Sequence, residues 1–304
     1  MFEMKDWSER VLASVGPQGP HPQEYAGTAL AFSWIRKYDK NYLQTVQRLV
    51  IDPHEAWLNA DPDHLNYGMY FNLLLHIWYQ PRGYAGDGDL LTKLYRSLDS
   101  AGADCPWVFN RWDSYIASRP EVLALQSRPE YLSMMASFAA EQGCTSFLDV
   151  GCGVGEFTRQ VYQEQGDRIT SLMGIDNDDM SISIARKGNR STGIDFVNMN
   201  VLETLPEGTF DVVWCVGLCD YLSHNMFVKF GRRLLTLQPK FVIIGNIGQS
   251  HPTKEMMSCL KWDLFDRSRF DLLALGEEIT CGNAYEVEVE TDRTGLQHFL
   301  RIRL

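Results

Sequence analysis

The sequence predicts an α/β fold whose second half is a doubly wound, mainly parallel sheet and whose first half is helical. Strand-like and helix-like segments alternate from residue 146 onward, and a glycine-rich loop separates the first such strand from the first helix. Strands that alternate with helices pair in parallel, because each crossover helix packs back onto the sheet. With 304 residues, of which 45% are hydrophobic, the chain can form one large domain or two modest ones.

Residues 1–140 are predicted to form a helical cap or lid region. Apolar residues recur at helical spacing through residues 29–50 and 67–79. Asp52 and Asp87 each precede a helical pattern, and an aspartate at this position can cap the first turn of a helix. This helical region could mediate homodimerisation as easily as it covers a ligand site.

Residues 141–304 are predicted to form the main domain, and a helix over about 129–142 leads into it. The expected strands span residues 146–150, 171–176, 194–197, 210–216 and 240–245, and the helices between the first three strands span residues 158–165 and 179–187. The tail departs from this alternation, because residues 285–290 and 297–304 flank a polar turn and predict a closing antiparallel hairpin. Together these segments predict a seven-stranded sheet with an antiparallel last strand.

The charge balance argues against nucleic acid as a partner. The chain has 28 basic and 39 acidic residues, and it lacks a basic cluster of the kind that neutralises phosphates. No apolar run approaches the ~18 residues that cross a bilayer, and the N-terminus does not resemble a secretory signal. The seven cysteines form no CxxC pair and no zinc-ligand set. We therefore expect reduced thiols in a cytoplasmic protein, without a metal and without membrane attachment.

The segment DVGCGVG, residues 149–155, follows the first predicted strand and opens the first helix. In a dinucleotide site such a loop brings a pyrophosphate to a helix N-terminus. Two features differ from that pattern: the glycines are spaced GxGxG, and Asp149 stands two residues before the first glycine. A carboxylate there repels a pyrophosphate and suits a cationic ligand with an amino group and a sulfonium. Asp176 ends the second strand, where an acid can accept hydrogen bonds from both ribose hydroxyls.

In these residues the chain resembles the class I S-adenosylmethionine-dependent methyltransferases, over residues from about 146 to 304. The resemblance implies a Rossmann-like sheet, a methyltransferase activity and S-adenosyl-L-methionine as cofactor. The cofactor-binding residues that it implies are Asp149, Gly151, Gly153, Asp176, Asn177, Asn200, Val201 and Gly217. The first three contact the methionine part, Asp176 holds the ribose, and the segment around Asn200 contacts the adenine. Many members have Asp where Asn200 stands, but asparagine can still bond the adenine amino group.

A narrower resemblance links the chain to bacterial enzymes that make 3-hydroxypalmitic acid methyl ester, a quorum-sensing signal. It is carried by residues 81–87 (PRGYAGD), 217–223 (GLCDYLS) and 294–300 (TGLQHFL). The first segment is expected to fold over the cofactor as a lid. The second follows the fourth strand, and ligands of an open sheet bind beyond the carboxyl ends of its strands. Alternatively, Arg82 and Asp87 form a structural ion pair and a helix cap.

The candidate residues on the acceptor side are Arg82, Tyr84, Asp220, Tyr221 and His224. Asp220 and Tyr221 could orient the acceptor, and Arg82 could clamp an acceptor carboxylate. A carboxylate or a thioether is nucleophilic as it stands, whereas a hydroxyl or an ammonium must first lose a proton. His224 is the candidate base for such a proton, although an exposed histidine at a helix start is an equally good interpretation.

The sequence therefore predicts an S-adenosylmethionine-dependent methyltransferase of small-molecule metabolism. The acceptor could be a carboxylate or an amino acid, including the sulfur of methionine. Two alternatives stay open. One is a non-catalytic S-adenosylmethionine-binding module on the same fold, and the other is an NAD(P)-dependent oxidoreductase.

Overall fold

The computed structural model describes residues 80, 83–96, 119–189, 193–249, 254, 257 and 262–304. Contacts divide the chain into two units. One comprises Leu123–His251 and Leu264–Leu304 and contains the whole sheet, and we call it the sheet unit. The other comprises Met1–Val122 and Pro252–Asp263, and we call it the N-terminal unit.

In the N-terminal unit, α7 spans Gly88–Arg96. Asp87 caps it, because its carboxylate accepts a hydrogen bond from Leu90 N at 2.8 Å. The predicted cap at Asp87 is therefore confirmed. The helical patterns of residues 29–50 and 67–79 and the cap expected at Asp52 lie outside the described residues, so the predicted cap region stays a prediction.

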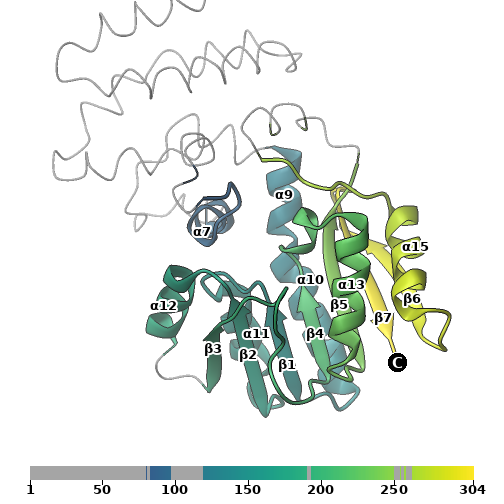
Figure 1. Ribbon diagram of the computed structural model, residues 1–304. Coiled ribbons are helices and arrows are strands. Elements are labelled where there is room, and N and C mark those ends of the chain that lie inside the picture. The colour runs from purple at the N-terminus through teal and green to yellow at the C-terminus, as the bar shows by residue number, and fades with distance from the viewer. Residues whose placement is uncertain are drawn as a thin grey trace, which may run out of the picture. The chain divides into compact units, whose positions relative to one another are not determined.

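Seven strands form one sheet in the order β3-β2-β1-β4-β5-β7-β6 (Figure 1). The strands are β1 Ser146–Val150, β2 Ser171–Asp176, β3 Ile194–Asn198, β4 Val212–Cys215, β5 Phe241–Ile247, β6 Glu286–Thr291 and β7 Gln297–Arg303. Strands β1 to β5 pair in parallel, and β7 lies antiparallel between β5 and β6. The predicted seven-stranded sheet and its closing antiparallel hairpin are confirmed.

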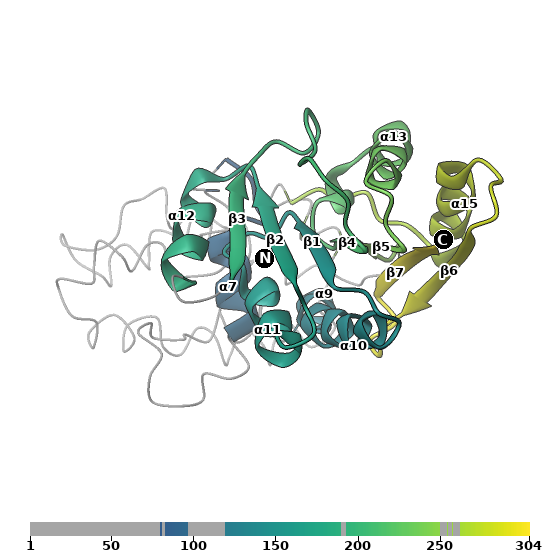
Figure 2. The same ribbon diagram turned by 90° about the horizontal axis from the view of Figure 1, so that it is seen from below.

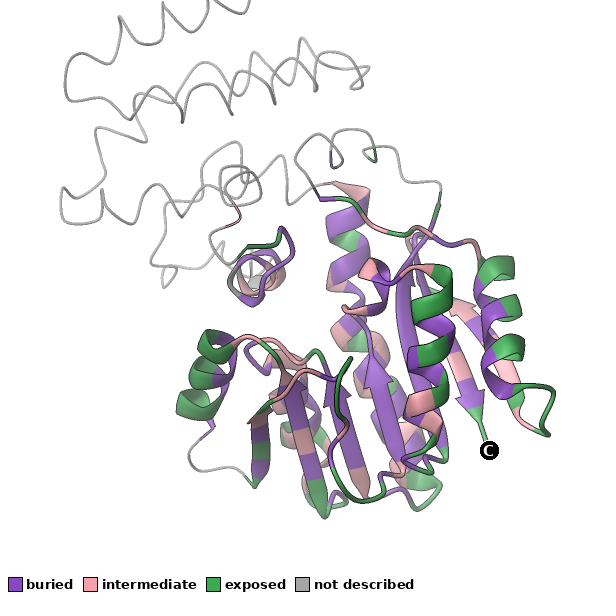
Figure 3. Ribbon diagram, in the orientation of Figure 1, coloured by how far each residue is buried: buried purple, intermediate pink, exposed green. Residues whose placement is uncertain are grey.

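Helices cover both faces of this sheet. They are α10 Arg128–Glu141, α11 Glu156–Gln165, α12 Asp179–Gly188, α13 His224–Leu235 and α15 Arg269–Thr280, and α9 Pro120–Gln126 precedes α10. Figure 2 shows α10 and α11 on one face and α13 and α15 on the other. The buried apolar residues of α12 belong to the same cluster as those of α10 and α11. The central strands β1, β4 and β5 are buried almost throughout (Figure 3), as expected for apolar strands covered on both faces.

Local capping explains where two of the helices begin. Asp178 precedes α12 and accepts a hydrogen bond from Met180 N at 3.0 Å. Ser268 precedes α15 and forms a capping box with Asp271, in which each side chain accepts from the other residue's backbone N–H. These bonds satisfy N–H groups that have no partner inside the helix.

Strand β4 is shorter than the predicted strand over residues 210–216. Phe210 N instead donates to Leu237 O at 3.3 Å. Asp211 accepts hydrogen bonds from Thr145 N at 2.8 Å and from Ser146 N at 3.1 Å. The two residues before β4 therefore close loops at the amino edge of the sheet instead of extending the strand.

Within the described ranges, no helix has both the length and the apolar character needed to cross a bilayer. The cysteines of those ranges are free thiols, and the Sγ atoms of Cys215 and Cys219 lie 3.7 Å apart. In the same part of the chain, no group of three or more His, Cys, Asp or Glu side chains is placed to hold a metal ion.

Candidate active site

The glycine loop, residues 151–155, joins β1 to α11 at the carboxyl edge of the sheet. Gly151, Gly153 and Gly155 have φ values of 76°, 55° and 73°, in the left-handed region that favours glycine. Gly155 also allows close packing, because a Cβ there would lie 2.5 Å from the ring of Phe196 on β3. The loop conformation therefore depends on glycine at these positions.

The backbone N–H groups of the glycine loop are used inside the protein. Gly151 N and Cys152 N both donate to Ile175 O, at 2.8 and 3.1 Å. Gly153 N donates to Oδ2 of Asp176 at 2.8 Å, and Gly155 N donates to Cys152 O at 2.9 Å. The loop thus presents none of these four N–H groups to a ligand.

Asp149 lies under the glycine loop, on β1, and is 2% exposed. Its Oδ2 accepts a hydrogen bond from Thr158 Oγ1 of α11 at 2.6 Å. Burial raises the pKa of this carboxyl to about 7, against the opposing effect of Thr158. The neighbouring indole of Trp214 also lowers the pKa of Asp149. Its Nε1 lies too far from ideal geometry to count as a hydrogen-bond donor to any described residue. Asp149 is therefore a carboxyl that gains strongly from a nearby positive charge.

Asp176 ends β2 and connects two loops at the edge of the sheet. Its Oδ2 accepts from Gly153 N at 2.8 Å, and its Oδ1 accepts from Asp178 N at 2.9 Å. Burial raises the pKa of Asp176, while these two backbone donors lower it. Each carboxylate oxygen keeps a lone pair for a further donor, such as a ribose hydroxyl.

The predicted adenine segment lies next to Asp176, since Met199 N donates to Asp176 O at 2.9 Å. The amide of Asn200 is engaged in a turn: its Oδ1 accepts from Leu202 N at 3.1 Å and its Nδ2 donates to Glu203 at 2.8 Å. The role of Asn200 as an adenine contact stays a prediction. To bind adenine, the Asn200 amide would have to share or give up its bonds to Leu202 and Glu203. Val201 is buried and Asn177 is exposed.

The loop after β4 lies beside the glycine loop. It runs from Val216 into η2, a 3-10 turn over Cys219–Tyr221. A Cβ at Gly151 would lie 3.6 Å from Cβ of Leu218, so the two loops are in contact range. The strand order changes direction between β1 and β4, and ligands of open α/β sheets bind at such a switch point. Gly217 and its neighbours therefore flank the expected ligand position.

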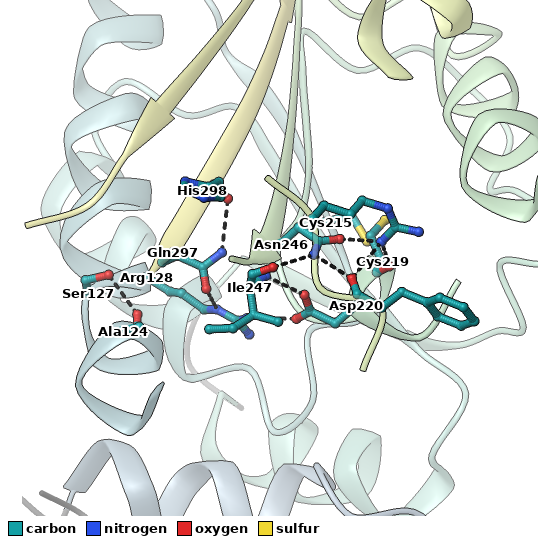
Figure 4. Close-up of polar contacts among 12 residues, drawn as sticks. Ala124, Ser127, Arg128, Cys215, Cys219, Asp220, Asn246, Ile247, Gln297 and His298 are labelled. Carbon is teal, nitrogen blue, oxygen red and sulfur yellow. Dashed lines mark hydrogen bonds and ion pairs between the residues drawn. The ribbon is translucent and has the colours of Figure 1, made fainter. Parts of the chain in front are cut away.

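Asp220 lies in a buried polar network at the carboxyl ends of β4 and β5 (Figure 4). Its Oδ2 pairs with Nη2 of Arg128, at the start of α10, at 2.9 Å. Its Oδ1 accepts from Ile247 N at 2.7 Å, and Nε of Arg128 donates to Oε1 of Gln297 at 2.8 Å. Burial raises the pKa of Asp220, and Arg128, Ile247 N and Arg267 oppose this shift. Asp220 and Arg128 thus link α10, β5 and β7 at the edge of the site.

Arg267 completes the network on the side of α13. Its guanidinium donates to Cys219 O at 3.1 Å, to Oδ1 of Asn246 at 2.6 Å and to Leu222 O. It also lies over the ring of Phe227, 4.6 Å from the centroid. Sequence reasoning noted Gln297 only within the segment 294–300, and it missed the network residues Arg128, Asn246 and Arg267. No local pattern marks them, because their partners are distant along the chain.

His224 begins α13 and its side chain is 63% exposed. Its Nε2 lies 2.9 Å from a carboxylate oxygen of Glu278 on α15. Tyr221 is half-buried in η2. Of the other predicted acceptor-side residues, Tyr84 lies exposed in the N-terminal unit, and Arg82 lies outside the described residues. The predicted roles of these four residues stay predictions.

Comparisons with known proteins bear on the family and the fold. Residues 147–237 match a family model described as methyltransferase domain. Magnesium protoporphyrin IX methyltransferase from Synechocystis PCC 6803, with bound SAH, has a TM-score of 0.52 at 11% identity, over 80% of this chain and 100% of that one. A possible exported protein from Bordetella parapertussis has a TM-score of 0.57 at 16% identity, over 94% of this chain and 99% of that one.

The search of curated proteins found no match. At these identities the solved structures are informative about the fold alone. Residues 147–237 thus match the methyltransferase-domain family, and the sheet unit, which includes them, has the Rossmann-like fold of methyltransferases.

Proposed function

We propose that this protein is an S-adenosylmethionine-dependent methyltransferase that acts on a small molecule. The observation that carries the proposal is the hydrogen bond from Gly153 N to Asp176. The N–H groups of Gly151, Cys152 and Gly155 in the same loop also bond inward. Three acidic residues surround this loop, namely Asp149, Asp176 and Glu156 in the first turn of α11. Such a loop suits a ligand with cationic groups and hydroxyls.

The same loop argues against an NAD(P)-dependent oxidoreductase. A dinucleotide site needs free backbone N–H groups and a helix N-terminus for the pyrophosphate. Here the Asp176 carboxylate takes the N–H of Gly153, and Glu156 places a negative charge in the first turn of the helix. A diphosphate would therefore meet two carboxylates where it needs donors.

The residues present fit the cofactor. Asp149 supplies negative charge below the glycine loop for its cationic methionine part, and Asp176 has lone pairs for its ribose hydroxyls. When bound, the cofactor supplies a methyl group that its sulfonium has already activated. The loop from Gly217 to Tyr221 lies beside the glycine loop at the carboxyl edge of the sheet, where it would help to position an acceptor.

The acceptor class is proposed more specifically as a carboxylate or an amino acid, including the sulfur of methionine. The narrower resemblance to 3-hydroxypalmitic acid methyl ester synthases supports a carboxylate. Such acceptors need no base, so His224 acts as a base only if a hydroxyl or an ammonium is methylated. The acceptor-side roles predicted for Arg82 and Tyr84 stay part of this proposal.

Calorimetry with S-adenosylmethionine and with NAD tests the cofactor. We expect the wild type to bind S-adenosylmethionine and not NAD, and we expect Asp149→Asn to weaken binding at least tenfold. Asp195→Asn is the matched control, because Asp195 is an exposed acid on β3. Binding of NAD in place of S-adenosylmethionine, or undiminished binding by Asp149→Asn, contradicts the proposal.

Turnover requires a second experiment. The protein is incubated with methyl-labelled S-adenosylmethionine and a metabolite extract, and labelled products are identified by mass spectrometry. We expect a labelled small molecule that carries a carboxylate or a methyl ester. Cofactor binding with no labelled product from any extract would instead favour the non-catalytic binding module.

A further inference from the structure

Arg128 has an unused end. It is 3% exposed, and two of its five N–H donors are engaged, Nε with Gln297 at 2.8 Å and Nη2 with Asp220 at 2.9 Å. The third nitrogen, Nη1, makes no hydrogen bond to any residue that the structure describes. A buried guanidinium held on one edge and open at the other is well suited to bind an anion.

The open end faces the loop after β4. Nη1 lies 3.8 Å from the position that a Cβ would take at Gly217. The φ of Gly217 lies outside the left-handed region, so its backbone conformation does not require glycine. Among the described residues apart from its neighbours in the chain, nothing other than Nη1 lies within 4 Å of that Cβ position, so the missing side chain leaves room there in front of Nη1. This room adjoins the loop where Leu218 approaches Gly151, and thus the expected cofactor position.

The charge of Arg128 itself is only partly balanced by its described partner. Asp220 is the described carboxylate that pairs with Arg128, and it also interacts with Arg267. Asp266 and Asp271 also lie near Arg267. Arg128 therefore has to share its carboxylate partner, Asp220, with a second guanidinium. A carboxylate at Nη1 would therefore form a charge-assisted hydrogen bond in a largely water-excluded place.

We propose that Arg128 binds the carboxylate of the acceptor through Nη1 and selects anionic over neutral acceptors. This inference rests on the proposed function and assigns to Arg128 the clamp that the sequence placed at Arg82. Fatty acids and amino acids both carry the required group. Asp220 and Gln297 are positioning residues, because they fix the guanidinium plane without reaching the acceptor.

Matched acids and amides test this proposal on protein saturated with S-adenosylhomocysteine. The probes are octanoate against octanamide and L-methionine against L-methioninamide, with dissociation constants from ligand-observed NMR. We expect the wild type to bind at least one of the two acids at least tenfold more tightly than its amide. In Arg128→Lys and Gly217→Ala this ratio should fall to within about twofold of one. Arg128→Lys keeps a charge for Asp220, and Gly217→Ala fills the room while keeping the arginine.

Arg303→Lys is the control, because it alters a guanidinium that pairs with Glu286 at the opposite end of β7 from Gln297. It should keep the wild-type acid-to-amide ratio, and circular dichroism checks the fold of every variant. Equal binding of acid and amide by the wild type, no acid binding at all, or a ratio that both site variants preserve would overturn the role of Arg128. Failure to bind S-adenosylhomocysteine would instead overturn the proposed function.

Discussion

Gly153 and Asp176 are joined by a 2.8 Å hydrogen bond from the backbone N–H of the first to Oδ2 of the second. The bond links the loop after β1 to the end of β2, 23 residues further along the chain. The bond gives a donor to the Asp176 carboxylate, which holds the ribose of the cofactor in the proposed complex. It also fixes the loop that lies beside the methionine part of the cofactor. The two halves of the proposed cofactor site are therefore coupled through one carboxylate.

This coupling predicts that Asp176→Ala weakens cofactor binding more than the loss of a single ribose contact would. We expect at least a tenfold rise in the dissociation constant of S-adenosylhomocysteine, or about 1.4 kcal/mol or more. Asp176→Asn keeps an oxygen for Gly153 N and should fall between wild type and Asp176→Ala. Calorimetry measures both, with exposed Asp195→Ala as the control. Equal affinities for wild type and Asp176→Ala would contradict the coupling.

The buried carboxyl of Asp149 predicts a pH-dependent affinity for S-adenosylmethionine. Its pKa is raised to about 7, mainly by burial, so the ionised form that attracts a cation predominates only above that pH. We expect affinity to fall about tenfold per pH unit below about pH 7 and to level off above it. Asp149→Asn should remove this dependence. Thr158→Val removes a bond that lowers the pKa and should move the midpoint to higher pH.

The stability of the unliganded protein should show the opposite trend. Because the folded-state pKa of Asp149 is raised, its contribution to the free energy of unfolding is fully present below about pH 4 and is lost as the pH rises through about 7. Urea unfolding between pH 5 and 8 measures this, and Asp149→Asn should show a weaker decline over that range. A steeper decline in the variant would be inconsistent with a raised pKa.

Gly155 is expected to tolerate alanine poorly for two reasons, strain and overlap. Its φ is +73°, and a Cβ would lie 2.5 Å from Phe196 and 3.3 Å from Ala185. Gly143 has a φ of +79° with nothing within 4 Å of the added Cβ, so Gly143→Ala isolates the strain. We expect Gly155→Ala to cost about 1–3 kcal/mol more than Gly143→Ala in urea unfolding. Equal losses would mean that the overlap is relieved by small movements of Phe196.

The ion pair between Arg128 and Asp220 predicts a large stability effect, because both side chains are buried. Asp220→Asn leaves the guanidinium without its carboxylate and should lower the free energy of unfolding by about 3 kcal/mol. Glu278→Gln is the matched exposed case, since its partner His224 lies at the surface. There we expect a loss of about 0–1 kcal/mol. Similar losses in both variants would argue that Asp220 is not a structural anchor.

Much of the fold and part of the candidate site follow from local patterns in the sequence. Alternating apolar segments and the glycine loop predict the strands and their order of connection, because periodicity and glycine act over a few residues. Asp149 and Asp176 could be identified for the same reason, since each stands at a fixed place relative to a predicted strand end. The sequence analysis set no bounds for helices α13 and α15, although they pack against one face of the sheet.

The tertiary structure alone decided how the acceptor side is built. Arg128 contacts Asp220, 92 residues away, and Gln297, 169 residues away. No periodicity records such contacts, because they exist only after α10, β4 and β7 meet at one edge of the sheet. The sequence thus determined which loops hold the cofactor in the proposed site. Folding decided that Asp220 is a buried ion-pair partner and that Arg128 presents, beside Gly217, a nitrogen that no described residue binds.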